Sequence, residues 1–548
     1  MMLKRLLVAA AISAIIEPTP GMADEAFTSI TKEDLAVHIE LLSSDAFEGR
    51  APGTAGEEKT VSYVSSQFER AGAQPWKRKS YEQPIPLVEV TRKDGAVFSV
   101  EANGAKETFK LLDEFVPFAG TPKGAADLKN ARLVFAGYGV DAPELGWNDY
   151  QNIDVEGAIV VLMRGEPARE NDEDFFWGRE LTEYYHYQKK YETAAQKGAV
   201  GAILIHTEES AGWPWSLLSG GGAGSSQYFI DEAQSEASLE VSLQISEPAA
   251  KRLFSLYGKD YDDVIQQANE SADASFVFDG TADIRFAGQR RKLSSSNVIA
   301  KIQGASQPDE CVIYTAHWDH VGVNTELEGD QIFNGALDNA TGIAALIELA
   351  EAFNKLPEAP RRSVYFIATA VEEKGLLGAQ YLVDHPVCAP EKTVAVLNID
   401  SLFPFGSFEA MTIVGYGYSE IQDEFAAAVK TVNRVIQPDS NPEIGGFFRN
   451  DAYPFAKAGI PAIYAVGGPL NEKIEDDPAL LQRFIDYGTN KYHKPADEYD
   501  AETWDLRGVE EDVKVFFEVG RSLADSEKFP NWRYDLPFRT LRDRMMAK

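Results

Sequence analysis

Three apolar runs near the middle of the chain determine the expected fold. They cover residues 311–316, 364–371 and 393–399, and they are short, nearly continuous and rich in β-branched side chains. Runs of this kind predict buried strands of a mostly parallel sheet. After the first run, residues 334–342 open an apolar helix that continues to about Phe353. This order predicts an α/β domain with helices on both faces of the sheet.

The segments on either side of this region extend the pattern. Thr31 is a candidate N-cap of a first helix with acidic residues in its first turn. A turn-rich loop over residues 43–54 precedes a second helix that ends near Phe68. From about Gln83 the pattern changes to short alternating strands broken by Gly, Pro and Asn, which predicts a β-rich region. A closing helix is expected at about residues 509–524.

The length of the chain predicts its number of domains, and its first residues predict where the protein is located. At 548 residues the chain is long enough for two or more domains and a large core. A basic start at Lys4, an apolar run over residues 6–16 and small residues up to Ala23 are typical of a secretory signal peptide. The apolar run is too short to span a bilayer, and no later stretch approaches a span. We therefore expect a signal peptide over residues 1–23 and a mature protein that is soluble and secreted or periplasmic.

Charge limits the classes of partner. The formal net charge is −34 at pH 7. Binding to nucleic acid or to an anionic membrane requires clustered Lys and Arg, so neither partner is expected. A well-solvated acidic surface is the simpler interpretation of the charge.

The chain contains two cysteines, Cys311 and Cys388. They could pair in an oxidising compartment, but their spacing alone does not show it. Because Cys311 begins a predicted core strand, the preferred interpretation is two buried free thiols.

Histidine and carboxylate residues follow each of the three predicted strands. Ligands of an open α/β sheet gather at the carboxyl ends of its strands, so these side chains are expected to converge. Adjacent glutamates are usually a solvated surface pair, which is a weaker interpretation at the end of an apolar strand. Single histidines are usually structural, and this is the role we assign to five of them: His38, His186, His206, His320 and His385.

Five sequence pieces carry a family resemblance. They are HWDH from His317, NGALDNATG from Asn334, VEEKGLLGAQYL from Val371, LNIDS from Leu397 and YHKPADEYD from Tyr492. No piece is decisive alone. Together, in this order and at strand ends, they resemble the M28 family of zinc peptidases, whose members include aminopeptidases and glutamate carboxypeptidase-like enzymes.

The resemblance implies a pair of zinc ions. His317 and Asp400 would hold one ion, Glu373 and His493 would hold the other, and Asp338 would bridge the two. Imidazole and carboxylate ligands suit zinc, with Co²⁺ or Mn²⁺ as substitutes. Peptides would be the substrates.

The resemblance also assigns roles beside the metals. Glu372 would be the general base that takes a proton from the attacking water and later gives one to the leaving amine. Asp319 would orient the ligand His317 without itself binding the metal. The peptide bond between Asp338 and Asn339 is expected to be cis.

A second family resemblance lies in the β-rich region. The runs 133–140, 157–165 and 194–205 resemble the protease-associated (PA) domain, which M28 enzymes carry within the peptidase domain. The Gly-rich stretch 219–226 is interpreted as a mobile loop rather than a lid over the cleft. The predicted divisions are a signal peptide over 1–23, the first part of the peptidase domain over 24–114, the inserted PA domain over 115–285 and the main catalytic domain over 286–548.

Three positions bear on specificity and on the N-terminal loop. Where many M28 aminopeptidases have Ser-Asp-His, this chain has Asn-Asp-Ala at 450–452, which is more similar to the carboxypeptidase-type members. A tyrosine that stabilises the tetrahedral intermediate in some members aligns with Phe447, so its role passes to Tyr492 or is absent. In a loop that resembles the family's N-terminal segment, Arg50 either fixes that loop near the catalytic domain or is solvated.

The expected activity follows from these positions. Recognition of a carboxylate would require a cluster of arginines, and only Arg449 lies near the site in sequence. We therefore expect an aminopeptidase acting on peptides, with a carboxypeptidase or dipeptidase as the alternative. A metal-free, receptor-like relative is a third possibility, disfavoured because all five ligands and the base are present. The oligomeric state does not follow from the sequence.

Overall fold

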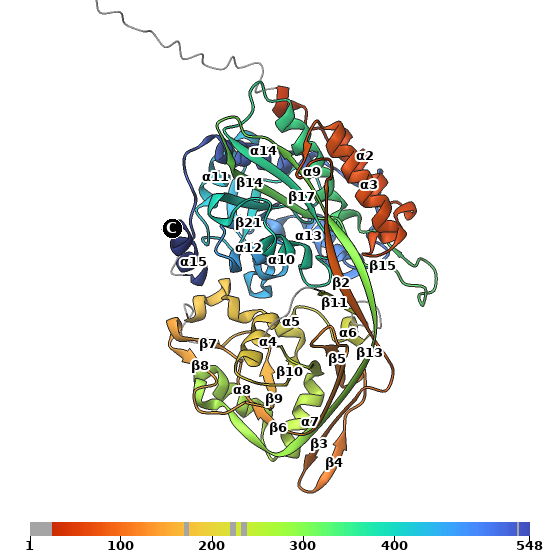
Figure 1. Cartoon of the computed structure of the whole chain (residues 1–548), viewed down its shortest axis with the longest axis vertical. Helices are drawn as coiled ribbons and strands as arrows, with labels where there is room; N and C mark the ends of the chain where they lie inside the picture. The colour runs from red at the N-terminus through yellow and green to blue at the C-terminus, as the bar shows by residue number, and fades with distance from the viewer. Residues whose placement is uncertain (1–24, 169–174, 220–225, 232–237, 534–535, 548) are drawn as a thin grey trace, which may run out of the picture.

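The computed structural model describes residues 25–168, 175–219, 226–231, 238–533 and 536–547. The predicted signal peptide and most of the Gly-rich stretch therefore lie outside the described residues. Figure 1 shows two lobes, an α/β lobe at the top and a β-rich lobe below it. Within the described part of the chain, we find no helix with the length and apolar character needed to cross a membrane.

The three predicted central strands are present and lie next to one another. They are β14 (Gln307–His317), β17 (Arg362–Thr369) and β18 (Thr393–Asn398). β14 pairs in parallel with both of the others, and β18 pairs in parallel with β21 (Ala462–Gly468). Antiparallel strands complete the sheet on both sides: β13 (Phe276–Ile302) beside β17, and β19 (Ala410–Val414) beside β21. The expected α/β class with a mostly parallel centre is confirmed.

Helices cover both faces of this sheet. Val312 and Tyr314 of β14 face one layer, while Ile313 faces the other. The first layer contains α2 (Lys32–Leu42), α3 (Ala55–Arg70), α9 (Thr341–Asn354) and α14 (Arg507–Asp525). The second contains α10 (Leu377–Asp384), α12 (Ala452–Lys457) and α15 (Pro537–Met546). Because successive residues of a strand point to opposite faces, a continuous apolar run is what a sheet covered on both sides requires.

The lower lobe has its own sheet and its own core. Its strand order is β5–β12–β10–β9–β6–β13, and β9, β10 and β12 are parallel. The bounds are β5 (Phe115–Ala119), β6 (Ala125–Phe135), β9 (Ile159–Met163), β10 (Gly201–His206) and β12 (Val241–Ser246). Three helices accompany this sheet: α4 (Tyr187–Gln196), α7 (Glu247–Leu256) and α8 (Tyr261–Glu270).

One long strand connects the two lobes. The first part of β13 pairs with β6 and with β3 (Val97–Ala102), both in the lower lobe. Its last part pairs with β2 (Glu82–Arg92) and then with β17 in the upper lobe. In Figure 1, β2 and β13 run together from one lobe to the other. β13 therefore continues through the predicted division at residue 285, and the division points themselves stay predictions.

The N-terminal helices pack onto the α/β lobe. Thr31 is the N-cap of α2, as predicted, and its side chain accepts the amide N–H of Asp34. Arg50, in the turn between α2 and α3, is only 1 % exposed and donates to main-chain carbonyls near the predicted site. Of the two alternatives for Arg50, the one that fixes its loop to the catalytic domain is therefore correct.

The two cysteines form a disulfide bond, so the expectation of two free thiols was wrong. Cys311 points to the face of β14 that α10 covers. Cys388 lies in the loop just after α10, and that loop crosses the start of β14. Burial at a strand start says nothing about which loop covers that strand, and the loop is what brings the second cysteine within reach.

This disulfide predicts a difference in stability. Cys388→Ser should lower the thermal unfolding midpoint in non-reducing buffer, because closing a long loop typically contributes about 2–4 kcal/mol. Differential scanning calorimetry with and without a reductant measures the effect. The reductant should lower the midpoint of the wild type and leave that of the variant unchanged. Equal midpoints for both proteins in non-reducing buffer would argue against the bond.

Candidate metal centre

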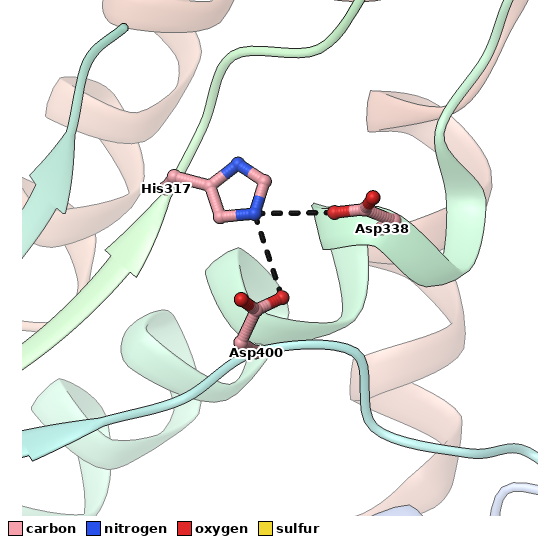
Figure 2. A group of neighbouring side chains, drawn as sticks. All are labelled: His317, Asp338 and Asp400. Carbon is pink, nitrogen blue, oxygen red and sulfur yellow. Dashed lines mark ion pairs between the residues drawn. The ribbon is translucent and has the colours of Figure 1, made fainter. Parts of the chain in front are cut away.

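The carboxylate of Asp338 faces two groups of possible ligands. Its Oδ1 lies 3.1 Å from Nε2 of His317, and its Oδ2 lies 3.1 Å from Nε2 of His493. Asp400 completes the first group, with Oδ1 3.5 Å from the same His317 nitrogen, and Figure 2 shows these three side chains converging. Glu373 completes the second, with Oε2 3.1 Å from Nε2 of His493. The five residues predicted as ligands thus lie together, while their role as ligands stays a prediction.

The sheet explains why these residues meet. His317 is the last residue of β14 and lies opposite Thr369 of β17, so the two strands end at the same level. Glu373 and Asp400 follow the ends of β17 and β18 within a few residues. Asp338 lies in the single turn η6 (Ala336–Ala340) that opens α9, and the expected cis peptide bond follows it. His493 comes from the far end of the chain, just after the turn η12 (Tyr487–Lys491).

The distances fit zinc. Ligands at about 2.0–2.1 Å from a tetrahedral zinc lie roughly 3.3 Å from one another. The four nitrogen–oxygen separations, between 3.1 and 3.5 Å, are close to that edge length. Two imidazoles and three carboxylates are also the donor types that zinc binds in proteins. The residues present therefore fit a pair of zinc ions.

The electrostatic charge of the site also favours the binding of metal ions. Burial by itself would lower the pKa of His317, but the carboxylates of Glu372 and Asp400 outweigh it and raise that pKa well above its usual range. Glu373 does the same for His493. Because carboxylates raise the pKa of both histidines, the site has an excess of negative charge. Divalent cations would balance this charge.

A main-chain contact sets the orientation of His317. Its Nδ1 lies 3.0 Å from the carbonyl oxygen of Asp319, so a proton on Nδ1 leaves the Nε2 lone pair facing Asp338. The Asp319 carboxylate instead accepts the amide N–H groups of Glu372 and Glu373, at 3.0 and 3.4 Å. Asp319 therefore contacts His317 through its main chain, and its side chain fixes the pair of glutamates.

Glu372 and Glu373 are adjacent but differently placed. Glu373 contacts histidines with both oxygens, whereas Glu372 forms no ion pair within the described part of the chain. Burial raises the pKa of Glu372 well above its usual range. A carboxylate with a raised pKa accepts a proton more readily near neutral pH, which is what a general base requires.

Two buried residues, His320 and Asp497, contact candidate ligands, although the sequence analysis gave neither a role in the site. His320 is fully buried, and its Nδ1 lies 2.7 Å from Oε1 of Glu373, the oxygen that faces away from His493. Asp497 accepts the amide N–H of Asp338 at 3.1 Å. The available signals were the positions of these residues, three after His317 and four after His493.

Three residues depart from the family pattern, and all are buried: Phe447, Asn450 and Ala452. Phe447 packs against Tyr418 and Trp532, away from the ligands. Tyr492, in contrast, stacks on His493 with ring centroids 4.0 Å apart, so it is the tyrosine beside the site. Asp451 accepts a hydrogen bond from the Thr369 hydroxyl at the end of β17, which makes it part of the scaffold.

The lower lobe reaches the edge of the site through residues 185–188, which lead into α4. A Cβ at Gly375, just beyond the two glutamates, would lie 3.2 Å from Nε2 of Gln188. The ring of His186 lies 5.4 Å from that of Tyr453 in α12. The PA-like lobe therefore borders the loops that carry the candidate catalytic residues.

Comparisons with known proteins agree with this architecture. Residues 297–514 match the model of peptidase family M28, and residues 129–253 match that of the PA domain. The chain is 29 % identical over 140 residues to a probable zinc metalloprotease of Pyrenophora tritici-repentis, a match that covers 25 % of this chain and 31 % of that protein. It is 31 % identical over 145 residues to aminopeptidase NAALADL1 of Mus musculus, which covers 26 % and 17 %.

The chain thus spans a third or less of the length of these curated relatives. A solved structure, the aminopeptidase from Aneurinibacillus sp. strain AM-1, aligns over 94 % of this chain and 99 % of its own. The TM-score is 0.52 at 17 % identity, so this likeness concerns the fold alone. The two family models thus identify a peptidase domain of family M28 over residues 297–514 and a PA domain over residues 129–253.

Proposed function

We propose that the chain is a secreted or periplasmic exopeptidase with two zinc ions, acting as an aminopeptidase on peptides. The observation that supports it most is the placement of Asp338, whose two carboxylate oxygens face two separate groups of histidine and carboxylate donors. A residue so placed can bridge two ions, and two-metal hydrolases use such pairs.

The residues around the site supply the remaining chemistry. When bound, the zinc ions would polarise the scissile carbonyl and lower the pKa of the attacking water. Glu372 accepts the proton that this water loses and later delivers a proton to the leaving amine nitrogen. Asp319 holds the main chain at Glu372 and Glu373, and thereby keeps the base and the ligand apart.

The names of two similar proteins support the aminopeptidase assignment. The mouse relative and the Aneurinibacillus structure both carry the name aminopeptidase.

A second candidate is a carboxypeptidase or dipeptidase, and one observation favours it. Arg449 is not alone, because Arg164 at the end of β9 also lies nearby. Burial, and then repulsion by Arg449, lowers the pKa of Arg164, and neither arginine has an ion pair among the described residues. Burial lowers the pKa of Arg449, but nearby groups, among them Tyr492, Tyr185 and Glu372, outweigh it and raise that pKa. Two guanidinium groups without a carboxylate partner among the described residues suit a substrate carboxylate.

The first prediction from the proposed function concerns the metals. The purified protein should contain two zinc ions per chain, roughly 3.5–4 Å apart. Chelation should abolish peptide hydrolysis, and added zinc should restore it. Inductively coupled plasma mass spectrometry measures the content; one equivalent or none, with no gain on adding zinc, would contradict the two-ion site.

The second prediction separates the base from the bridge. Glu372→Gln removes the proton acceptor but keeps its size, so kcat should fall by at least about 10²–10⁴-fold with little change in KM and in metal content. Asp338→Asn should instead lose metal, because it removes the charge that both ions share. Metal content and rate are measured on both variants. Near-normal turnover in Glu372→Gln would require another base.

The third prediction concerns the end of the peptide that is recognised. An aminopeptidase should cleave a peptide with a free N-terminus whether or not its C-terminus is amidated, and should not cleave the N-acetylated form. Arg449→Met should then leave the ratio of kcat/KM for the free and amidated peptides unchanged. If amidation abolishes cleavage in the wild type and Arg449→Met weakens only the free-carboxylate substrate, the second candidate is correct.

A further inference from the structure

The loop before the bridging residue, residues 334–338, is held on its carbonyl side by one buried arginine. Arg50 donates from Nη1 to the carbonyl of Asn334 at 2.6 Å and from Nη2 to that of Gly335 at 2.7 Å. It also donates to the carbonyl of Trp318, at 2.9 Å, which follows the ligand His317. A planar guanidinium group carries several donors in fixed directions, so it can join separate loops in one geometry.

The same loop is held on its amide side by Asp497. The two carboxylate oxygens of Asp497 accept the N–H groups of Leu337 and Asp338, at 3.0 and 3.1 Å, and its carbonyl accepts that of Ala336. Asp497 is 1 % exposed and lies four residues after His493, so it ties the segment of one ligand to the loop of another.

The loop has little room to relax between these two contacts. Gly335 has a φ of 57°, and a Cβ there would lie 2.4 Å from the carbonyl oxygen of Asp338 and 2.6 Å from the His320 ring. If either polar contact were lost, the carbonyl or amide groups left behind would be buried without a partner. A buried polar group without a partner is destabilising, which would favour a shifted loop.

We propose that Arg50 and Asp497 are positioning residues that clamp residues 334–338 from opposite sides and thereby determine how tightly the site binds its two metal ions. The proposal rests on the proposed function, because it takes Asp338 as the bridging ligand. The clamp joins the three parts of the chain that the site needs: the end of β14, the turn before α9 and the segment that carries His493. It also gives the N-terminal turn between α2 and α3 a role in the site.

A variant that keeps the charge isolates the geometric role. Removing the cation entirely would have two opposite effects, since a positive charge near the site repels metal ions while the hydrogen bonds hold their ligand in place. Arg50→Lys retains the charge but cannot reach several carbonyls at once. It should therefore weaken zinc binding. Asp497→Asn replaces one accepting oxygen with a donor that faces a main-chain N–H, and it should weaken zinc binding as well.

Arg542 provides a matched control. It is also 1 % exposed and also donates to main-chain carbonyls, those of Pro390 and Thr393. Thr393 begins β18, at the end of the strand opposite to Asp400. Arg542→Lys should therefore disturb a buried arginine of the same kind without affecting the loop at residues 334–338.

The test is a competition titration of the metal-free full chain with zinc and a chromophoric chelator, on wild type and the three variants. Arg50→Lys and Asp497→Asn should each bind zinc about 10–100-fold more weakly than wild type, the usual effect of removing a residue that orients a ligand. Arg542→Lys should bind as wild type does, even if its thermal midpoint falls. Circular dichroism checks folding, and if Arg50→Lys does not fold, Asp497→Asn decides alone.

Two results would overturn the clamp: wild-type affinity in the folded Arg50→Lys and Asp497→Asn variants, or an equal loss of affinity in Arg542→Lys. Failure of the proposed function gives a different result, because the wild type itself would then bind no zinc at this site. The absorption spectrum of the cobalt-substituted protein adds a second readout. It should change in the two clamp variants and remain unchanged in the control.

Discussion

The structure depends on burying several carboxylates at one point and giving them counter-charges. Asp400 and Glu373 each lie within a few ångströms of Asp338, and three histidines lie among these carboxylates: His317, His320 and His493. Buried charges of like sign are costly unless cations neutralise them. The parallel strands place these groups at one edge of the sheet.

Other residues of the upper lobe fix the relative positions of these charged side chains. The level ends of β14 and β17 place His317 and Glu373 on the same edge, and Asp319 fixes the turn that separates Glu372 from Glu373. The lower lobe is attached through the paired strands β2 and β13 rather than through a flexible linker. Its residues around Gln188 border the loop that follows Glu373.

Much of this arrangement could be predicted from local pattern. Continuous apolar runs specify strands covered on both faces, and polar residues at their ends lie where such sheets bind ligands. This reasoning grouped the polar residues at the strand ends, whereas the resemblance to the M28 family supplied the full ligand set, including His493, which is far away in sequence. The α/β class and the two helical layers follow from the same periodicity.

The rest depends on contacts between distant segments, for which the sequence has no local signal. The pairing of Cys311 with Cys388 follows from the loop after α10, and the electrostatic repulsion between Arg164 and Arg449 follows from how the lobes meet. Arg50 was recognised only as part of a similar segment, because its partners are main-chain carbonyls, which no residue type marks. His320 was assigned a structural role, because its contact with Glu373 depends on how the chain folds.

The central claim is that Asp338 bridges two metal ions. A crystal of the zinc-loaded protein, measured at wavelengths on both sides of the zinc absorption edge, tests it most directly. The account predicts two anomalous peaks that both contact the Asp338 carboxylate, one beside His317 and Asp400 and the other beside Glu373 and His493. A single peak, or peaks that do not share Asp338, would contradict it.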